Sequence, residues 1–464
     1  MPAISQTRFD TLALSPATLE NLGRLGYHEM TAIQAASLPA ALAGQDVIAQ
    51  AKTGSGKTAA FALALLSRLD ARRFDVQALV LCPTRELADQ VTTEIRRLAR
   101  AEDNIKVVTL SGGVPLRGQA NSLGHGAHIV VGTPGRVIDH MDRGHLQLDA
   151  LSTLVLDEAD RMLDMGFVDD MVRVASQCPM TRQTLLFSAT YPEGIAKLAS
   201  RFLRNPVTVK VDAQHASEQI EQRWYEVTEQ ERLPGVAKLL EHFRPAGALA
   251  FCNTKARCRE LAELLQAQGY SALALHGELE QRDRDQVLVR FANGSCTVLV
   301  ATDVAARGLD IAGLAAVINV DVTPDPEVHV HRIGRTGRAG ETGLALSLAS
   351  LDEMGAVGRI ELLQSRESKW YPLAELTPAG GARLLPKMVT VHIQAGRKDK
   401  IRPGDVLGAL TADLGYTREQ VGKIDINEFA TYVAVAREIG GDVVARLNEG
   451  RIKGRSVKAR LLKD

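Results

Sequence analysis

The feature that most constrains the fold is a glycine-rich segment, Ala51–Thr58, between two apolar runs. Gln45–Gln50 before it predicts a strand, and Ala59–Leu66 after it predicts a helix. Such a turn presents backbone amides and the positive end of a helix dipole to an anion. The sequence therefore predicts a phosphate-binding loop in which Lys57 reaches nucleotide phosphates and the Thr58 hydroxyl binds magnesium. The other predicted nucleotide contacts in the loop are Thr53, Gly54, Ser55 and Gly56.

Composition indicates a globular protein of several domains. The chain has 464 residues, 45% of them hydrophobic, and its 55 basic residues balance 55 acidic ones, so any nucleic-acid surface must be local. Its five cysteines are scattered without a Cys-x-x-Cys pair, which indicates neither a metal site nor a disulfide framework. No apolar run approaches the roughly 20 residues of a spanning helix. The polar segment Met1–Asp10 does not resemble a signal peptide, and we expect a cytoplasmic protein without membrane contact.

Apolar strand-like runs alternate with longer amphipathic runs in two successive blocks. The first block contains Ala78–Cys82, Lys106–Leu110, His128–Gly132, Thr153–Asp157 and Gln183–Phe187, and the second contains Ala248–Phe251, Ser271–Leu275, Thr297–Ala301, Ala316–Val320 and Gly343–Ser347. Continuous apolar runs separated by helices indicate a parallel sheet buried on both faces. We predict an α/β fold with two tandem parallel-sheet domains, at residues 1–208 and 219–364, joined by a linker at 209–218.

A third and smaller domain is predicted at residues 387–464, after a linker at 365–386 that is rich in Pro and Gly. Its expected elements are the strand Val389–Ile393, the helix Pro403–Leu414, the strands Val421–Asn427 and Ala430–Ala434, the helix Gly441–Asn448 and the strand Val457–Leu462. That order is the split ferredoxin-like arrangement of small α+β domains. We call residues 387–464 the tail domain.

An acidic segment, Asp157–Asp160, directly follows a predicted strand of the first block. Nucleotide hydrolysis needs carboxylates that hold magnesium and orient water. Asp157 is predicted to hold the metal, partly through water, and Glu158 to polarise the attacking water. An acidic cluster at this position can also be a helix cap, but the phosphate loop upstream favours the catalytic interpretation.

The segment Asp157-Glu158-Ala159-Asp160 resembles the name motif of the DEAD-box RNA helicases, and further motifs follow in that family's order through both α/β blocks. The resemblance implies two RecA-like domains, ATP and magnesium as cofactors, and RNA as partner. It also implies an adenine-reading element upstream of the phosphate loop, which includes Thr31. There Gln34 hydrogen-bonds the base edge, and Tyr27 or Phe9 stacks on the base.

Several loops resemble the elements through which this family contacts RNA. Their hydroxyls, backbone amides and arginines suit phosphate oxygens and the ribose 2′-OH. The implied contacts are Pro83, Thr84, Arg85, Gly113, Thr133, Pro134, Gly135 and Arg136 in the first domain, and Thr302 and Gly308 in the second. Ser188 and Thr190 resemble the element that couples hydrolysis to strand separation, and their hydroxyls are expected to bond the loop carrying Asp157 and Asp160.

The resemblance also places part of the ATP site on the second domain. The segment His331–Arg338 resembles the arginine-finger motif, in which Arg335 and Arg338 meet the γ-phosphate and His331 supports the water network. Asp310 is implied to reach the nucleotide ribose. Because the phosphate loop lies in the first domain, hydrolysis is expected to require domain closure.

The tail domain resembles the RRM-like domain with which DEAD-box proteins of the DbpA type bind a hairpin of large-subunit ribosomal RNA. Its 15 Lys or Arg and 10 Asp or Glu residues give a net charge of +5. Arg397, Lys398 and Lys400 are the candidate RNA contacts, with a solvated charged face as the alternative. The third strand offers one aromatic side chain, Tyr432, so the stacking platform is poor and a protein-binding role stays open.

Together these features predict an RNA-dependent ATPase and non-processive RNA helicase. Its expected target is 23S ribosomal RNA in large-subunit precursors during ribosome assembly, and it is expected to act as a monomer. Two alternatives stay open. One is a general helicase for mRNA or cold-shock structures, and the other is an ATP-gated RNA clamp that unwinds little.

Overall fold

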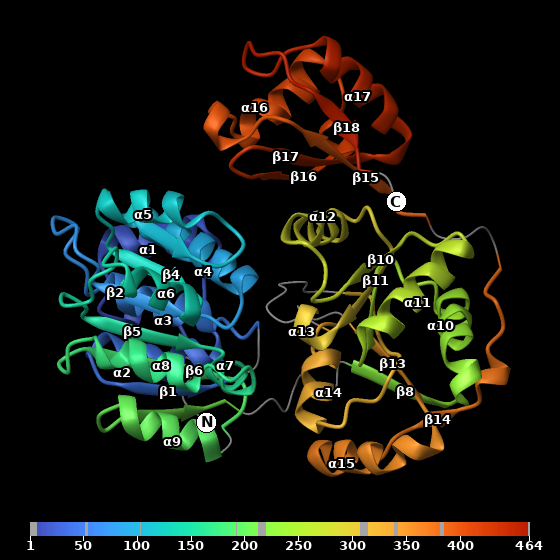
Figure 1. The fold of residues 1–464 in the computed structure, drawn as a ribbon, viewed down its shortest axis with the longest axis horizontal. Coiled ribbons are helices and arrows are strands. Elements are labelled where there is room, and N and C mark those ends of the chain that lie inside the picture. Colours follow the sequence, from blue (N-terminus) through green and yellow to red (C-terminus); the bar gives the residue numbers. More distant parts are fainter. Residues whose placement is uncertain are drawn as a thin grey trace. The chain divides into compact units, whose positions relative to one another are not determined.

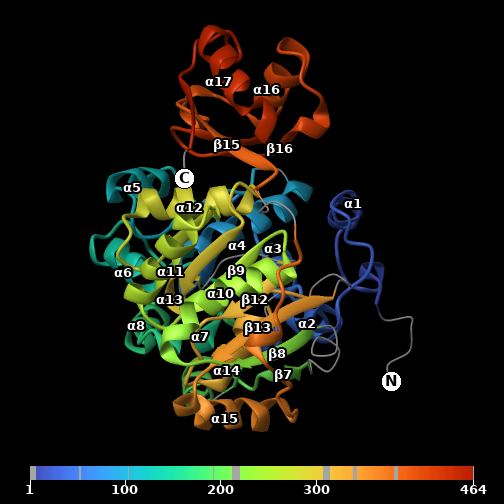
Figure 2. The same cartoon turned by 90° about the vertical axis from the view of Figure 1, so that its right-hand side faces the viewer.

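The computed structural model describes residues 7–51, 54–102, 104–191, 193–211, 220–306, 314–337, 342–380 and 385–462. The chain forms two compact units, one holding the first sheet and the other holding two further sheets. Their elements can be followed in two views at right angles (Figure 1) (Figure 2). Within the described ranges, no helix is both long and apolar enough to span a membrane.

The first sheet has seven parallel strands in the order β3-β4-β2-β5-β6-β1-β7. They are β1 (Val47–Gln50), β2 (Ala78–Leu81), β3 (Val107–Leu110), β4 (Ile129–Gly132), β5 (Thr153–Asp157), β6 (Gln183–Ser188) and β7 (Val207–Lys210). The helices are α1 (Pro16–Arg24), α2 (Ala32–Leu42), α3 (Lys57–Leu66), α4 (Arg85–Leu98), α5 (Leu116–Gly124), α6 (Pro134–Asp142), α7 (Ala159–Asp164), α8 (Val168–Ser176) and α9 (Glu193–Phe202).

Both faces of this sheet are buried, because parallel strands need crossover helices that cover them. Alternate residues of β2 show this: Val80 packs in one apolar cluster with α1–α4, and Leu79 packs in a second cluster with α5–α9. The carboxyl ends of all seven strands therefore lie at one edge of the layer, where ligands of such sheets bind.

The second sheet is also parallel and has seven strands, in the order β10-β11-β9-β12-β13-β8-β14. They are β8 (Ile220–Glu226), β9 (Ala248–Cys252), β10 (Ala272–Leu275), β11 (Val298–Thr302), β12 (Ala316–Asn319), β13 (Gly343–Ala349) and β14 (Trp370–Tyr371). Its helices are α10 (Glu229–Phe243), α11 (Lys255–Ala267), α12 (Gln281–Ala292), α13 (Asp303–Ala306), α14 (Pro326–Ile333) and α15 (Met354–Gln364).

The tail domain has a four-stranded antiparallel sheet in the order β16-β17-β15-β18. Its strands are β15 (Met388–Ile393), β16 (Val421–Ile426), β17 (Thr431–Ala436) and β18 (Ala459–Leu461), and its helices are α16 (Pro403–Gly408) and α17 (Gly440–Glu449). Val406 and Val443 from the two helices share one apolar cluster with Val391 and Val433 from the central strands. Both helices therefore pack on one face of the sheet.

The fold class predicted from the sequence is confirmed, and each predicted apolar run of the two α/β blocks forms a strand. The differences lie at the margins. The predicted linker 365–386 contains Trp370–Tyr371, which pairs with Trp224 and Tyr225 of β8 as an edge strand. In the tail, the predicted helix Pro403–Leu414 is α-helical to Gly408 and continues as a π-helical turn over Ala409–Asp413.

Candidate nucleotide and RNA sites

The phosphate loop begins at the end of β1 and runs into α3, whose first residue is Lys57. The Lys57 side chain is 6% exposed, and its Nζ donates a 2.8 Å hydrogen bond to the Ala51 carbonyl. Gly54 and Gly56 have φ of 80° and 92°, a left-handed conformation that glycine adopts readily. The Lys57 side chain therefore joins the end of the loop to its first residue, Ala51. The predicted contact Thr53 lies outside the described residues.

The predicted adenine-reading element is joined directly to this loop. Thr31 and Gln34 cap the start of α2: the Thr31 N–H donates to Gln34 Oε1 at 2.9 Å. Gln34 Nε2 donates to the Gly56 carbonyl at 3.0 Å. A Cβ at Gly56 would come within 2.5 Å of Gln34 Nε2, so glycine is required for this approach.

The two aromatic candidates for base stacking differ in access. Phe9 is 4% exposed and belongs to the core cluster of the first domain. Tyr27 is half-buried, meets Phe9 edge to face at 6.3 Å between ring centroids, and donates its hydroxyl to Glu94 at 2.6 Å. Tyr27 is therefore the more accessible of the two rings.

Asp157 ends β5, one strand away from β6 and two from β1, and is 3% exposed. Burial, together with Glu158 and Asp160 and against the opposing effect of Lys57, raises the pKa of Asp157 to about 7. A buried carboxylate of this kind favours a bound cation, and carboxylate and hydroxyl oxygens are ligands that magnesium accepts. Asp157 and Thr58 therefore fit a magnesium site by their chemistry.

Glu158 has a strained backbone. Its φ of 52° and ψ of 50° place a non-glycine residue in the left-handed region, at the N-cap of α7. Such conformations cost about 1–3 kcal/mol and persist where the surroundings hold them. Arg161 Nη1 lies 3.2 Å from Glu158 Oε2, and both side chains are 6% exposed. This buried ion pair, which the sequence did not predict, places a positive charge beside the carboxylate expected to orient water, although the two atoms do not have hydrogen-bond geometry.

Asp160 links the acidic segment to the end of β6. Its Oδ2 accepts hydrogen bonds from the Thr190 hydroxyl at 3.1 Å, the Thr190 N–H at 2.9 Å and the Ala189 N–H at 3.1 Å. The Asp160 N–H donates to Ser188 Oγ at 3.3 Å. The predicted bonding between the two motifs is present, while the coupling role of Ser188 and Thr190 stays a prediction.

The predicted RNA contacts of the first domain follow three neighbouring strands, β2, β3 and β4. Thr84 caps α4 by accepting from Leu87 N–H at 3.3 Å. Arg136 donates to the Val114 carbonyl at 3.0 Å and to Gln119 Oε1 at 2.8 Å, which ties two of these loops together. The eight predicted residues are thus brought to one edge: Pro83, Thr84, Arg85, Gly113, Thr133, Pro134, Gly135 and Arg136.

In the second domain, the finger motif occupies α14 and the turn after it. His331 lies in α14, Arg335 follows it with 5% exposure, and Thr302 ends β11 with 8% exposure. The predicted residues Gly308, Asp310 and Arg338 lie outside the described residues.

A buried arginine that the sequence did not single out, Arg332, holds this region in place. Its guanidinium donates two 2.7 Å bonds to the Asp303 carboxylate, one of 2.7 Å to the Asp321 carbonyl and one of 2.8 Å to Asn253 Oδ1. These partners follow β11, β12 and β9, so Arg332 fastens the finger helix to the ends of three strands. The sequence signal that could have identified Arg332 is its position inside the predicted finger motif, between His331 and Arg335.

The predicted RNA contacts of the tail, Arg397, Lys398 and Lys400, are all exposed in the turn after β15. Tyr432 on β17 is 6% exposed, and its ring lies 5.1 Å from that of His392. The sheet therefore offers a poor stacking platform, as expected.

Comparisons with known proteins agree with these features. Residues 31–198 match the DEAD/DEAH box helicase family, residues 231–340 the helicase conserved C-terminal domain, and residues 390–461 the DbpA RNA binding domain. The ATP-dependent RNA helicase DbpA of Escherichia coli (strain K12) is 52% identical over 98% of this chain and 100% of its own length. This chain belongs to the DEAD-box ATP-dependent RNA helicases.

Other members of the family match over less of the chain. The DEAD-box ATP-dependent RNA helicase CshA of Geobacillus kaustophilus is 45% identical over 78% of this chain and 77% of its own length. A solved structure of Saccharomyces cerevisiae Dbp5 bound to RNA and ADP BeF3 superposes with a TM-score of 0.72 at 30% identity, covering 79% of this chain and 96% of that one. This DEAD-box helicase therefore uses ATP and binds RNA.

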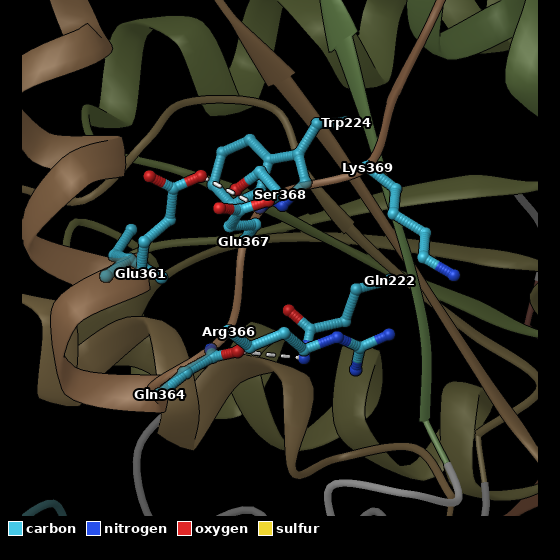
Figure 3. Close-up of a pocket in the computed structure, with 9 residues that line it drawn as sticks. Gln222, Trp224, Glu361, Gln364, Arg366, Glu367, Ser368 and Lys369 are labelled. Atoms are coloured by element: carbon cyan, nitrogen blue, oxygen red, sulfur yellow. Dashed lines mark hydrogen bonds between the residues drawn. The ribbon is translucent and has the colours of Figure 1, made fainter.

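One small pocket of the second domain lies apart from the DEAD-box motifs. It is lined by Gln222, Trp224, Ile360, Glu361, Gln364, Arg366, Glu367, Ser368 and Lys369 (Figure 3). Gln222 Nε2 donates to Gln364 Oε1 at 3.0 Å, and Ser368 N–H donates to Glu361 Oε1 at 2.8 Å. At about 10 Å³ it has room for roughly one water molecule, so we assign it no ligand.

Proposed function

We propose that this DEAD-box helicase separates short RNA duplexes in 23S ribosomal RNA of large-subunit precursors during ribosome assembly, as a cytoplasmic monomer. The observation that carries the proposal is the tail domain. It matches the DbpA RNA binding domain, has a net charge of +5, and exposes basic side chains on its loops. We place the domain boundaries at 1–208, 219–364 and 387–464.

On the first domain, Lys57 and the loop glycines hold the ATP phosphates, while Gln34 and Tyr27 recognise adenine. Thr58 and Asp157, the latter partly through water, would hold magnesium, which would neutralise negative charge on the nucleotide phosphates. Glu158, beside Arg161, orients the attacking water. Release of Lys57 from the Ala51 carbonyl and of Gln34 from Gly56 accompanies nucleotide entry, because both groups use those bonds here.

On the second domain, Arg335 and Arg338 supply positive charge to the γ-phosphate, His331 supports the water network, and Asp310 reaches the ribose. Hydrolysis then requires closure of the two domains. RNA contacts are assigned to both domains, so RNA favours closure and stimulates hydrolysis. By linkage, ATP tightens RNA binding by the same factor by which RNA tightens ATP binding.

The experiment measures ATP-driven release of a short strand from a duplex, with and without an adjoining fragment of 23S rRNA. The full chain is compared with the Arg397→Ala, Lys398→Ala, Lys400→Ala triple variant, and Lys57→Ala serves as the ATP control. We expect the rRNA fragment to accelerate release by wild type only. Equal acceleration of wild type and triple variant overturns the targeting role. Stable ATP-dependent binding without release identifies an RNA clamp instead.

A further inference from the structure

The tail domain displays one large apolar side chain that its core does not use. Phe429, in the turn between β16 and β17, is 63% exposed and is absent from the apolar cluster that joins the sheet to its helices. Lys398 Nζ lies 4.1 Å from the centroid of this ring and 2.9 Å from Glu428 Oε1. Proteins that bind single-stranded nucleic acid combine exposed aromatic rings, on which bases stack, with nearby cations that contact the backbone.

The turn that carries Phe429 is fixed to the loop after β15. Arg397 N–H donates to the Asn427 carbonyl at 2.9 Å, and Lys398 N–H donates to the Glu428 carbonyl at 3.0 Å. Gly396 allows this contact, because a Cβ there would come within 2.5 Å of the Asn427 oxygen. Backbone bonds therefore present the ring and Lys398 together, so little loop entropy is lost when a ligand binds.

A third loop brings further positive charge to the same end of the sheet. Lys453 Nζ donates to the Lys400 carbonyl at 2.9 Å, and Arg455 lies 3.4 Å from Asp399. The strand ends explain this convergence: the loop after β15, the turn between β16 and β17, and the loop before β18 share one end of an antiparallel sheet. The basic residues exposed on these loops are Arg397, Lys398, Lys400, Arg451, Lys453 and Arg455.

The aromatic side chains of the sheet itself are less accessible. Tyr432 and His392 are 6% and 7% exposed and pack on each other. Base stacking needs an open ring face, and phosphate contacts need nearby cations. In the described part of the tail domain, Phe429 is the large apolar side chain that meets both needs.

We propose that Phe429 is a stacking platform for an unpaired RNA base, while Lys398 and Lys400 contact the adjoining phosphates. This inference rests on the proposed function, since it specifies how the tail domain engages RNA. The proposal adds one aromatic contact to the basic loops of the tail domain, and this contact would recognise unpaired nucleotides. The tail is then selective for unpaired loops over continuous duplex.

The test measures binding of the full chain, at fixed salt, to a 23S rRNA hairpin with an unpaired loop and to a fully paired RNA of equal length. We expect Phe429→Ala to weaken hairpin binding roughly tenfold, within the range for loss of one stacked base, and to leave duplex binding unchanged. Phe429→Trp should retain hairpin affinity. Leu362→Ala, which removes an exposed apolar side chain from α15, is the matched control and should change neither.

Stacking has its own readout. Loop nucleotides are replaced one at a time by 2-aminopurine, whose fluorescence we expect to be quenched at one position by wild type and Phe429→Trp but not by Phe429→Ala. Unchanged hairpin affinity for Phe429→Ala overturns the stacking proposal and leaves the ring as a protein contact. If, in that case, the Arg397→Ala, Lys398→Ala, Lys400→Ala triple variant loses hairpin binding, the proposed function stands although the stacking proposal fails. Equal losses of Phe429→Ala on hairpin and duplex also overturn the proposal.

Discussion

Each of the two RecA-like domains contains its own seven-stranded parallel sheet, but the two domains hold their site residues in place by different kinds of bond. In the first domain, site side chains bond mainly to the backbone of neighbouring loops: Lys57 to Ala51, Gln34 to Gly56, and Asp160 to Ala189 and Thr190. Two of these bonds, those of Lys57 and Gln34, engage side chains that we propose contact the nucleotide. On that proposal, ATP binding exchanges these protein contacts for ligand contacts.

In the second domain, buried guanidinium groups do the corresponding work. Arg332 joins Asp303 and Asn253, while Arg232, 2% exposed, bonds to the Val320 carbonyl and Glu353, both at 2.7 Å. Asp321 accepts from Asn253 N–H at 2.8 Å and pairs with Arg257. A buried charge that loses its partner costs several kcal/mol. We therefore expect substitutions of the first-domain site residues to impair chemistry, and substitutions of Arg332 or Arg232 to destabilise the second domain as well.

The largest expected effects concern the two charged groups assigned to the phosphates. We expect Arg335→Ala to lower RNA-stimulated kcat by roughly 10³-fold or more, the range for arginine fingers, and Lys57→Ala to abolish hydrolysis as well. They differ in ATP affinity: Lys57→Ala should weaken ATP binding, and Arg335→Ala should spare much of it. Steady-state ATPase assays and equilibrium ATP binding measure both. An equal fall in ATP affinity contradicts the finger role.

Arg332→Ala should show most clearly that the two domains differ in how a site substitution changes the free energy of unfolding. It leaves Asp303 partly buried without its bidentate partner, so we expect the second domain to lose about 3–5 kcal/mol. Both tryptophans of the chain, Trp224 and Trp370, belong to the second sheet, so tryptophan fluorescence during urea unfolding reports on that domain. Lys57→Ala is the control and should leave this transition in place. An unchanged midpoint for Arg332→Ala refutes the fastening role.

Arg161 tests whether an ion pair matters in the first domain too. Because its buried positive charge lies 3.2 Å from the Glu158 carboxylate, we expect Arg161→Met to lower kcat about tenfold to a hundredfold, as for a misplaced catalytic group, without a matching rise in KM for ATP. Arg161→Lys should restore part of the rate. A loss confined to stability, with normal kcat at low temperature, shows a structural role alone.

The sequence predicted local features well and contacts between distant segments poorly. The run Thr297–Ala301 predicts the strand observed at Val298–Thr302, because continuous apolar runs flanked by helices have few other solutions. The two side-chain partners of Arg332, Asp303 and Asn253, lie 29 and 79 residues away, beyond any periodic pattern. Phe429 was missed because one aromatic residue in a polar turn carries no signal until its exposure and its lysine are seen. Gln34 was assigned to adenine, but its bond to Gly56 depends on the folded loop.

The smallest expected effect is a pH dependence of the free energy of unfolding of the second domain, caused by His329. His329 is 1% exposed and stacks on Trp224 at 5.3 Å between ring centroids. Neither ring nitrogen has a hydrogen-bond partner among the described residues. Burial, with a contribution from Arg332, lowers the pKa of His329 to about 3. In the folded protein the His329 ring is thus neutral at every pH well above 3.

The sign follows from linkage: the unfolded chain takes up a proton at an ordinary histidine pKa, while the folded domain does not until about pH 3. Stability from His329 is therefore complete above about pH 6.5 and falls as pH decreases towards 3. Between pH 7.5 and 5.5 the loss is about 1.4 kcal/mol. In His329→Phe the tryptophan-detected transition should shift less with pH by that amount, whereas the exposed control His28→Phe should follow wild type. Identical pH profiles for wild type and His329→Phe would show that the buried ring does not set the acid sensitivity of this domain.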